Sequence, residues 1–210
     1  MKSIVVPPKF TDSLVDNDLQ FMLDSDKICN CNFVECNVLT DNIRALEFNE
    51  CIFKKVKLSS LNFYNVQFVD LVFENCDFSN SSFDLCSFIR CEFKNCKLLG
   101  SNFLNCSINN VLFNGVYSYS NFANNKLKKV IFSNALLEEA RFLENNFSNL
   151  FINKCNINRI EFIKCNLCGL DFSTNTFDDI KINPEALNGV KMNIYQACIV
   201  ARKLGIIIEG

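Results

Sequence analysis

An apolar residue returns every five positions through most of this chain. The repeat is clearest in seven successive phenylalanines from residue 63 to residue 93, within a single register that runs from residue 28 to residue 113. A second register, displaced by one residue, continues from residue 122 to residue 182. The two registers hold 18 and 13 of these central residues, of which 19 are Phe, six Ile, five Leu and one Val. A repeat of this length decides the fold class.

A period of five fits neither a helix nor an uninterrupted strand. In a helix, at about 100° per residue, successive central residues would share no buried face. In a strand, where side chains alternate, each would point to the opposite side from the last. The pattern instead predicts short extended pieces joined by corners, with the chain turning at every fifth residue.

The position two residues before each centre supports this interpretation. It is mostly occupied by Cys, Val, Leu, Ala or Ile. Two positions along an extended segment share a face, so each unit is expected to point one large and one smaller residue inward. The outward positions hold most of the Asn, Ser and charged residues. Asn suits corners because it tolerates left-handed backbone.

Several units match a known motif. Residues 76–80 (CDFSN), 101–105 (SNFLN) and 170–174 (LDFST) fit A(D/N)LXX, often with Cys for Ala and Phe for Leu, so the chain resembles the pentapeptide-repeat proteins. The resemblance implies an all-β fold, a right-handed quadrilateral β-helix with four pentapeptides per coil. The 31 centres then give about eight coils, followed by a short C-terminal helix.

The repeat divides the chain into three parts. Residues 1–22 are expected to form an acidic N-terminal cap, residues 23–182 the β-helix, and residues 183–210 a helix and a short strand. Phe21 and Leu23 are candidates for the first inward pair. At residues 114–121 the register slips by one, which leaves two alternatives: a one-residue deletion absorbed by a tightened corner, or a small loop.

The chain contains 13 Cys, and ten of them fall on the inward position two before a centre. There Cys acts as a small hydrophobic residue. Cysteines 20 apart would stack in parallel on adjacent coils, which is poor disulfide geometry. We therefore expect free thiols in a reducing cytoplasm. Neither a signal peptide nor an apolar stretch of about 20 residues occurs, so no membrane association is predicted.

The sequence offers no catalytic constellation. It has no His and no nucleotide-binding glycine motif. The lack of His excludes His-dependent triads and His-containing zinc sites. The one CxxC, at Cys165 and Cys168, has its two thiols on opposite sides of the repeat. We therefore predict no enzyme activity, no cofactor and no metal.

The C-terminal part carries a helical pattern after Asn193, a candidate N-cap, and the helix is closed by Gly205. Its ending is similar to the helix-plus-strand tail with which the Qnr and MfpA members of the family dimerise. This resemblance implies a homodimer; the alternative is that some of the same apolar residues cap the last coil within one chain. The interface residues would be Ile194, Ala197, Cys198, Ala201, Leu204 and Ile206.

The same resemblance suggests a function. Qnr and MfpA proteins look like DNA in size and charge, bind DNA gyrase or topoisomerase IV, and lessen quinolone action. Direct binding to nucleic acid is disfavoured by the formal net charge of −2. The alternative is a protein-interaction scaffold with a different partner. The candidate partner surface comprises Glu138, Glu139, Asp178, Asp179, Tyr117 and Tyr119.

The surface charge of the folded rod separates these two functions. A continuous negative stripe would favour the DNA mimic, because it must replace phosphates against a basic groove. A mottled surface, or an outward apolar row such as Tyr64, Leu112 and Phe151, would favour the scaffold.

Overall fold

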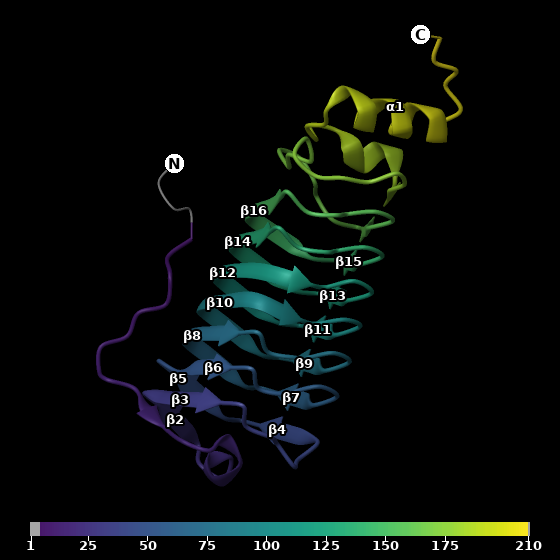
Figure 1. Ribbon diagram of the computed structural model, residues 1–210. Coiled ribbons are helices and arrows are strands. Elements are labelled where there is room, and N and C mark those ends of the chain that lie inside the picture. The colour runs from purple at the N-terminus through teal and green to yellow at the C-terminus, as the bar shows by residue number, and fades with distance from the viewer. Residues whose placement is uncertain (1–4, 210) are drawn as a thin grey trace.

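The computed structural model describes residues 5–209 as a stack of four-sided coils that ends in a short helix (Figure 1). Strand partners are parallel and one coil apart in sequence, as in the pairing of Phe68 with Phe88, so one coil takes four pentapeptides. We number the four faces by their central residues. Face 1 carries Phe68 and Phe88, face 2 Phe73 and Phe93, face 3 Phe78 and Leu98, and face 4 Phe83 and Phe103, with equivalents on other coils.

Faces 1 and 2 form one continuous sheet, because the strands of the middle coils run through the corner between them. The strands of this sheet are β1 (Val15–Asp16), β2 (Lys27–Cys29), β3 (Cys31–Val34), β5 (Glu47–Asn49), β6 (Ile52–Lys54), β8 (Gln67–Glu74), β10 (Ser87–Lys97), β12 (Ser107–Val116), β14 (Lys126–Ser133) and β16 (Asn146–Asn153).

Face 4 is a second sheet, made of eight short strands. They are β4 (Asn42–Arg44), β7 (Asn62–Tyr64), β9 (Ser82–Asp84), β11 (Asn102–Leu104), β13 (Asn121–Ala123), β15 (Arg141–Leu143), β17 (Glu161–Ile163) and β18 (Lys181–Ile182). Face 3 is held together by isolated bridges, such as Lys57 with Asp77.

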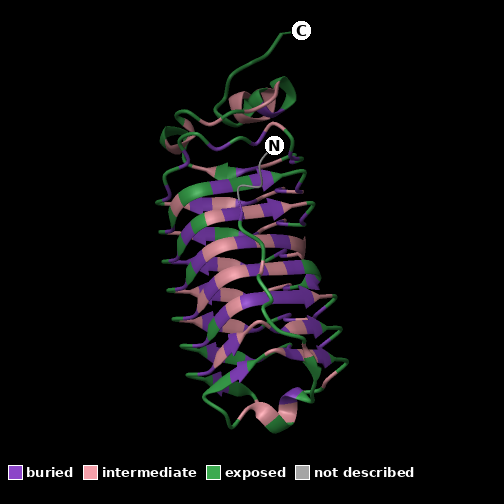
Figure 2. Ribbon diagram, turned by 90° about the vertical axis from the view of Figure 1, so that its left-hand side faces the viewer, coloured by how far each residue is buried: buried purple, intermediate pink, exposed green. Residues whose placement is uncertain are grey.

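The core follows the five-residue period. All 31 predicted centres are buried except Val38, Phe147 and Ile182, which are partly exposed. Their rings stack in columns along the axis, with centroids 4.6 Å apart for Phe68 and Phe88. Figure 2 shows the resulting alternation of buried and exposed positions along the strands. The prediction of inward centres is confirmed.

The corners are made by the residue two after each centre. Twenty-five non-glycine residues have positive φ, between 51° and 62°, and all stand at this position. Asn is the commonest residue there. Its tolerance of left-handed backbone explains this preference.

The second inward position carries hydrogen-bond donors as well as apolar groups. The thiol of Cys91 donates to Phe68 O at 3.3 Å, on the preceding coil. The buried amides of Asn125 and Asn145 make the equivalent bonds to Phe103 O and Phe122 O, at 2.9 and 2.7 Å. These asparagines were not predicted, because the position was expected to be apolar. All thirteen cysteines are free thiols, and burial raises the pKa of Cys91 to about 12.

The register slip is a one-residue deletion, not a loop. The corner residue after Phe113 is missing, and Gly115 pairs directly with Cys96. A Cβ on Gly115 would lie 2.0 Å from Cys96 O, and its φ is +136°, so glycine is required here. The rings of Phe103 and Phe122 still stack at 4.7 Å across the slip.

Tyr117 becomes the centre of face 3 on this coil. Its ring is fully buried and packs edge-on against Phe113 and Phe132, at 5.4 and 5.8 Å. Its placement on the partner surface is therefore wrong, because the deletion brings it to an inward position. Its hydroxyl has no hydrogen-bond partner among the described residues, and burial raises its pKa well above the usual value.

The N-terminal residues serve two different purposes. Residues 15–22 close the first coil through β1 and the 3-10 helix η1 (Leu19–Met22). Leu19 points inward and is fully buried, whereas Phe21 is 84% exposed. The predicted inward position of Phe21 is therefore wrong, because η1 turns the chain, whereas Leu23 is half-buried and packs against the core as expected.

Residues 5–14 leave the first coil and run along the outside of faces 1 and 2 (Figures 1 and 2). We call residues 5–11 the strap. Side chains at the corner between these faces, each on a different coil, hold it: Glu50 accepts from Thr11 N at 2.5 Å, Asp70 from Lys9 N at 2.9 Å, and Asn110 from Val6 N at 3.1 Å.

The C-terminal end contains η2 (Pro184–Leu187) and α1 (Ile194–Lys203). Asn193 caps α1 and forms a capping box with Gln196, which confirms the predicted start of the helix. The predicted strand at residues 206–208 does not form, because these residues have no neighbouring strand within the described chain.

Candidate interaction surfaces

The structure brings most of the predicted partner surface to one corner, between faces 3 and 4. Tyr119, Glu139, Arg159 and Asp179 occupy equivalent positions on successive coils, joined by backbone hydrogen bonds such as Arg159 N to Asp179 O at 2.7 Å. Glu138 and Asp178 stand beside them in sequence. Tyr117 is the one predicted member that lies inside the coil.

The charges on this corner are paired with opposite charges. Arg159 lies 2.6 Å from Glu138 and 2.9 Å from Glu139, and its hydrogen bond to Glu139 raises the pKa of the guanidinium. Lys203 of α1 lies 2.6 Å from Asp179, and this bond lowers the pKa of that carboxyl. The corner therefore alternates in sign from coil to coil.

The same alternation covers the side walls, which we define as residues 42–180. They contain 14 acidic and 14 basic residues, so their net charge is zero. Ion pairs join equivalent positions on neighbouring coils of the walls: Asp70–Arg90, Asp77–Lys97, Glu139–Arg159, Arg141–Glu161 and Glu144–Lys164. Two more, Lys27–Glu47 and Glu35–Lys55, join the N-terminal end to the walls. The walls are mottled and do not present a negative stripe.

The two ends of the rod differ from the walls and from each other. Residues 12–41 hold seven acidic residues and one lysine, a net charge of −6. Residues 181–209 hold four basic and two acidic residues, a net charge of +2. The rod therefore has an acidic N-terminal end and a basic C-terminal end.

At the C-terminal end, the residues that cap the last coil are not those predicted to form a dimer interface. Gln196 is buried, and its amide donates to Phe172 O and Asn175 O, both at 2.8 Å. Ile199 and Val200 pack against the core. The capping role of Gln196 was not predicted, although its spacing of three from Asn193 is a capping-box signal.

The predicted interface residues remain on the outer side of α1 and in the segment after it. Four of them are exposed: Ile194, Ala197, Leu204 and Ile206. The other two, Cys198 and Ala201, are half-buried. Capping the solenoid thus leaves this apolar face unpartnered within the described chain.

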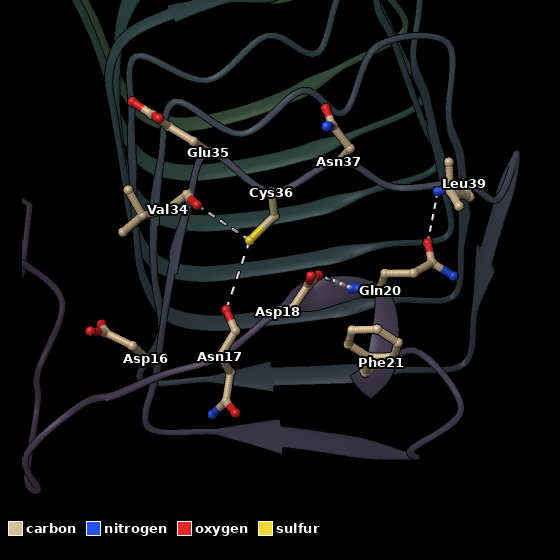
Figure 3. A pocket seen from close by; sticks show the side chains of 10 residues that line it. All are labelled: Asp16, Asn17, Asp18, Gln20, Phe21, Val34, Glu35, Cys36, Asn37 and Leu39. Carbon is tan, nitrogen blue, oxygen red and sulfur yellow. Dashed lines mark hydrogen bonds between the residues drawn. The ribbon is translucent and has the colours of Figure 1, made fainter.

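At the N-terminal end lies an open hollow of about 780 Å³, which we call the N-terminal hollow (Figure 3). Its walls are the cap segment at residues 16–21 and the first corner of face 3 at residues 34–39. Gln20 Oε1 accepts a hydrogen bond from Leu39 N at 2.7 Å, and the Cys36 thiol donates to Asn17 O at 3.8 Å. Because the cap turns into η1 here, it does not complete the first coil on face 3, and the hollow remains.

Reactive groups do not gather into a site within residues 5–209. This part of the chain has no cluster of three or more potential metal ligands. The two thiols of the CxxC point apart, with Cys165 buried and Cys168 exposed. Across the same residues, no helix is long and apolar enough to cross a bilayer.

Comparison with known proteins agrees with the repeat. A family model described as a pentapeptide repeat region matches residues 66–142. No curated protein matches the sequence.

Solved structures are similar over most of the chain. A trypsin-treated variant of QnrB1, a plasmid-mediated fluoroquinolone resistance protein, is 22% identical, with coverage of 87% of this chain and 90% of that chain and a TM-score of 0.35. HetL, a pentapeptide repeat protein involved in heterocyst differentiation regulation in the cyanobacterium Nostoc sp. strain PCC 7120, is 12% identical, with coverage of 80% and 83% and a TM-score of 0.37. Neither likeness bears on function.

The eight strands stacked on face 4 and the coil-to-coil pairing extend the same repeat on both sides of the matched segment. The chain is a pentapeptide-repeat β-solenoid of about eight turns.

Proposed function

We propose that this protein is a non-enzymatic scaffold that binds other proteins through the two ends of its rod. The observation that carries the proposal is the distribution of exposed apolar side chains and unbalanced charge. The most exposed large apolar residues, Phe21, Leu39, Tyr195 and Ile207, all lie at the ends, where they are 80% to 88% exposed. The walls between them have no net charge.

Contact surfaces between proteins commonly combine exposed apolar patches with complementary charge at the rim. The apolar row expected on the walls, Tyr64, Leu112 and Phe151, is less exposed than the residues at the ends. Leu112 is half-buried and Phe151 is 39% exposed, and both lie on the sheet along which the strap runs. Tyr64 stands alone on face 4 under Arg44, whose guanidinium lies 5.9 Å from the ring. The ends are therefore the better candidates for partner binding.

Affinity capture from a lysate of the source cells tests the proposal. The purified chain serves as bait beside three variants: Phe21→Ser with Leu39→Ser, Ile206→Ser with Ile207→Ser, and the wall control Phe151→Ser. Loss of a specific partner with an end variant but not with the wall control would support the scaffold. Equal capture by all four baits would overturn binding through the ends.

The second candidate function is mimicry of DNA towards DNA gyrase or topoisomerase IV, which would lessen quinolone action. The observation in its favour is the net charge of −6 at the N-terminal end. Dense carboxylates can replace phosphates against a basic surface. A homodimer through the outer face of α1 would place one acidic end at each extremity of the assembly.

A supercoiling assay with gyrase and a fluoroquinolone tests this second candidate. Restored supercoiling that is weakened by Asp16→Asn with Asp18→Asn, or by removal of residues 193–210, would support it. Neutralising Asp178 is the control, because that residue lies on the wall, far along the chain from the acidic N-terminal end. Absence of both protection and inhibition with a folded protein would overturn it.

A further inference from the structure

The N-terminal hollow exposes apolar side chains that no described part of the chain covers. Phe21 is 84% exposed, Leu39 86% and Val34 47%, and all three line the hollow. Figure 3 shows Phe21 and Leu39 on the same side of it, with Gln20 between them. The hollow measures about 780 Å³. Sites that hold ligands commonly enclose roughly 300 to 1000 Å³, so several side chains of a peptide segment would fit.

Three carboxylates, those of Asp16, Asp18 and Glu35, surround the hollow, and two of them have no basic partner within residues 5–209. Asp16 accepts a hydrogen bond from the Asn32 amide at 2.7 Å, and Asp18 accepts from Gln20 N at 3.0 Å. In this part of the chain, Glu35 is paired with the cation of Lys55 at 2.9 Å. The hollow is thus apolar at its walls and acidic at its rim, which fits a segment that combines apolar and basic side chains.

This chain carries such a segment at its opposite end. Residues 202–208 follow the last turn of α1 and read Arg-Lys-Leu-Gly-Ile-Ile-Ile. Ile206 is 54% and Ile207 88% exposed, and Arg202 makes no ion pair within residues 5–209. Figure 1 shows this segment projecting from the far end of the rod, away from the N-terminal cap.

Resting on the proposed use of the ends as binding surfaces, we propose that residues 202–208 of one copy dock in the N-terminal hollow of a second copy, and that the rods join head to tail. Charge favours this pairing over contact between two C-terminal ends. Head-to-tail contact brings an end with a net charge of −6 to an end with a net charge of +2. Contact between two C-terminal ends brings together two ends that each have a net charge of +2. Because the two contacting surfaces differ, the contact is heterologous, and it extends into chains of rods.

Charge-exchanged variants of the full-length protein test this geometry by sedimentation velocity at low salt. Asp16→Lys reverses a charge at the N-terminal end, and Arg202→Glu reverses a charge at the C-terminal end. Each alone is expected to weaken self-association at least tenfold. An equimolar mixture should restore association, because each altered end then meets the complementary altered end and the native ends still meet each other.

Two further variants complete the design. Asp84→Lys makes the same charge change on the wall and should leave association unchanged. Leu39→Ser removes an exposed apolar contact in the hollow without altering charge, so it provides an independent test should Asp16→Lys perturb β1. It is expected to weaken association at least tenfold, with an unchanged circular dichroism spectrum.

Three results would overturn the proposal. A protein that stays monomeric at the highest concentration reached in the centrifuge has no head-to-tail contact. Association that survives Asp16→Lys and Leu39→Ser but is lost with Arg202→Glu identifies a pair of C-terminal ends. Failure of the mixture to restore association excludes direct contact between the altered residues. In each case, end-dependent capture of another protein would leave the scaffold function standing.

Discussion

The walls and the two ends of this solenoid differ in whether their side chains find partners within the chain. On the walls, each coil supplies partners for its neighbours, so thiols and amides bond to carbonyls and ion pairs recur from coil to coil. At the ends no further coil follows, and Phe21, Leu39 and Ile207 remain exposed. The walls thus supply the contacts that stabilise the fold, whereas the ends carry the surfaces that we propose for binding. Substitutions should separate the two properties.

The largest effect on stability is expected at the register slip. Gly115→Ala places a Cβ 2.0 Å from Cys96 O, in a backbone contact that cannot relax without moving two coils. We expect the free energy of unfolding to fall by about 4 kcal/mol or more, measured by urea denaturation.

Gly169→Ala is the control for this substitution. The φ of Gly169 is +86°, but no atom lies within 4 Å of the added Cβ. Only the cost of left-handed backbone applies there, about 1–2 kcal/mol. Equal losses for the two variants would contradict the steric explanation.

The next effect is expected at the buried ion pair beneath the strap. Asp70 is 5% exposed and accepts two hydrogen bonds from Arg90, at 2.5 and 2.6 Å, besides that of Lys9 N. Asp70→Ala leaves Arg90 without its partner and should cost about 2 kcal/mol, since one side of the pair is partly solvated. Hydrogen exchange at Lys9 should accelerate.

The exposed wall pair of Glu144 and Lys164 supplies the control for Asp70. The side chains are 72% exposed for Lys164 and 43% for Glu144. Exposed pairs contribute little, so Glu144→Ala should cost less than about 0.5 kcal/mol. A loss at Glu144 as large as that at Asp70 would mean that burial does not set the strength of these pairs.

A smaller effect, of opposite sign, is expected at Tyr117. Its hydroxyl has no partner among the described residues. Removing it in Tyr117→Phe should stabilise the fold by about 1 kcal/mol. Burial raises the pKa of Tyr117 in the fold. The unfolded chain therefore loses this proton first, at a pKa of about 10. Below that pKa, ionisation of Tyr117 does not affect the stability of the fold. As the pH rises above it, the free energy of unfolding falls.

The pH dependence of Tyr117→Phe provides the measurement. Thermal unfolding followed from neutral to strongly alkaline pH should show a shallower alkaline decline in the variant than in the native protein. The remaining decline is expected from thiols such as Cys91, whose pKa is raised to about 12 in the fold. Parallel curves would contradict the raised pKa, because they would mean that Tyr117 loses its proton equally easily in the folded and the unfolded chain.

The smallest effect on stability is expected at the ends. Phe21→Ser and Ile207→Ser alter side chains that are 84% and 88% exposed. Unfolding free energies should therefore stay within about 0.5 kcal/mol of the native value. Self-association should nevertheless be lost. A loss of stability comparable to that of Asp70→Ala would show that these side chains belong to the core and not to a binding surface.

Much of the fold could be predicted because the period of five carries it. The centres and the left-handed corners follow from spacing alone, as does the pairing of Glu139 with Arg159, which stands one coil later. The place of the deletion could not be predicted, since the spacing allowed several corners. Only the backbone contact at Gly115 decides that Tyr117 turns inward.

The candidate surface was predictable only where the repeat extends. Sequence spacing placed Glu138, Glu139, Asp178 and Asp179 near one another, but it could not show that Lys203, from the non-repeating helix, neutralises Asp179. The N-terminal hollow lies where the period has not yet begun. Its shape depends on how η1 meets the first corner of face 3, and no pattern in residues 12–27 encodes that contact.

The strap also sets an order of events during folding. Each coil contacts only its neighbours, so the solenoid can grow one coil at a time from an early nucleus. The amide of Val6, however, is bonded to the side chain of Asn110, far along the sequence. The strap can close only after the coil that carries Asn110 has formed, although it is synthesised first. Protection of the Val6 amide from hydrogen exchange therefore reports when the first half of the solenoid has folded.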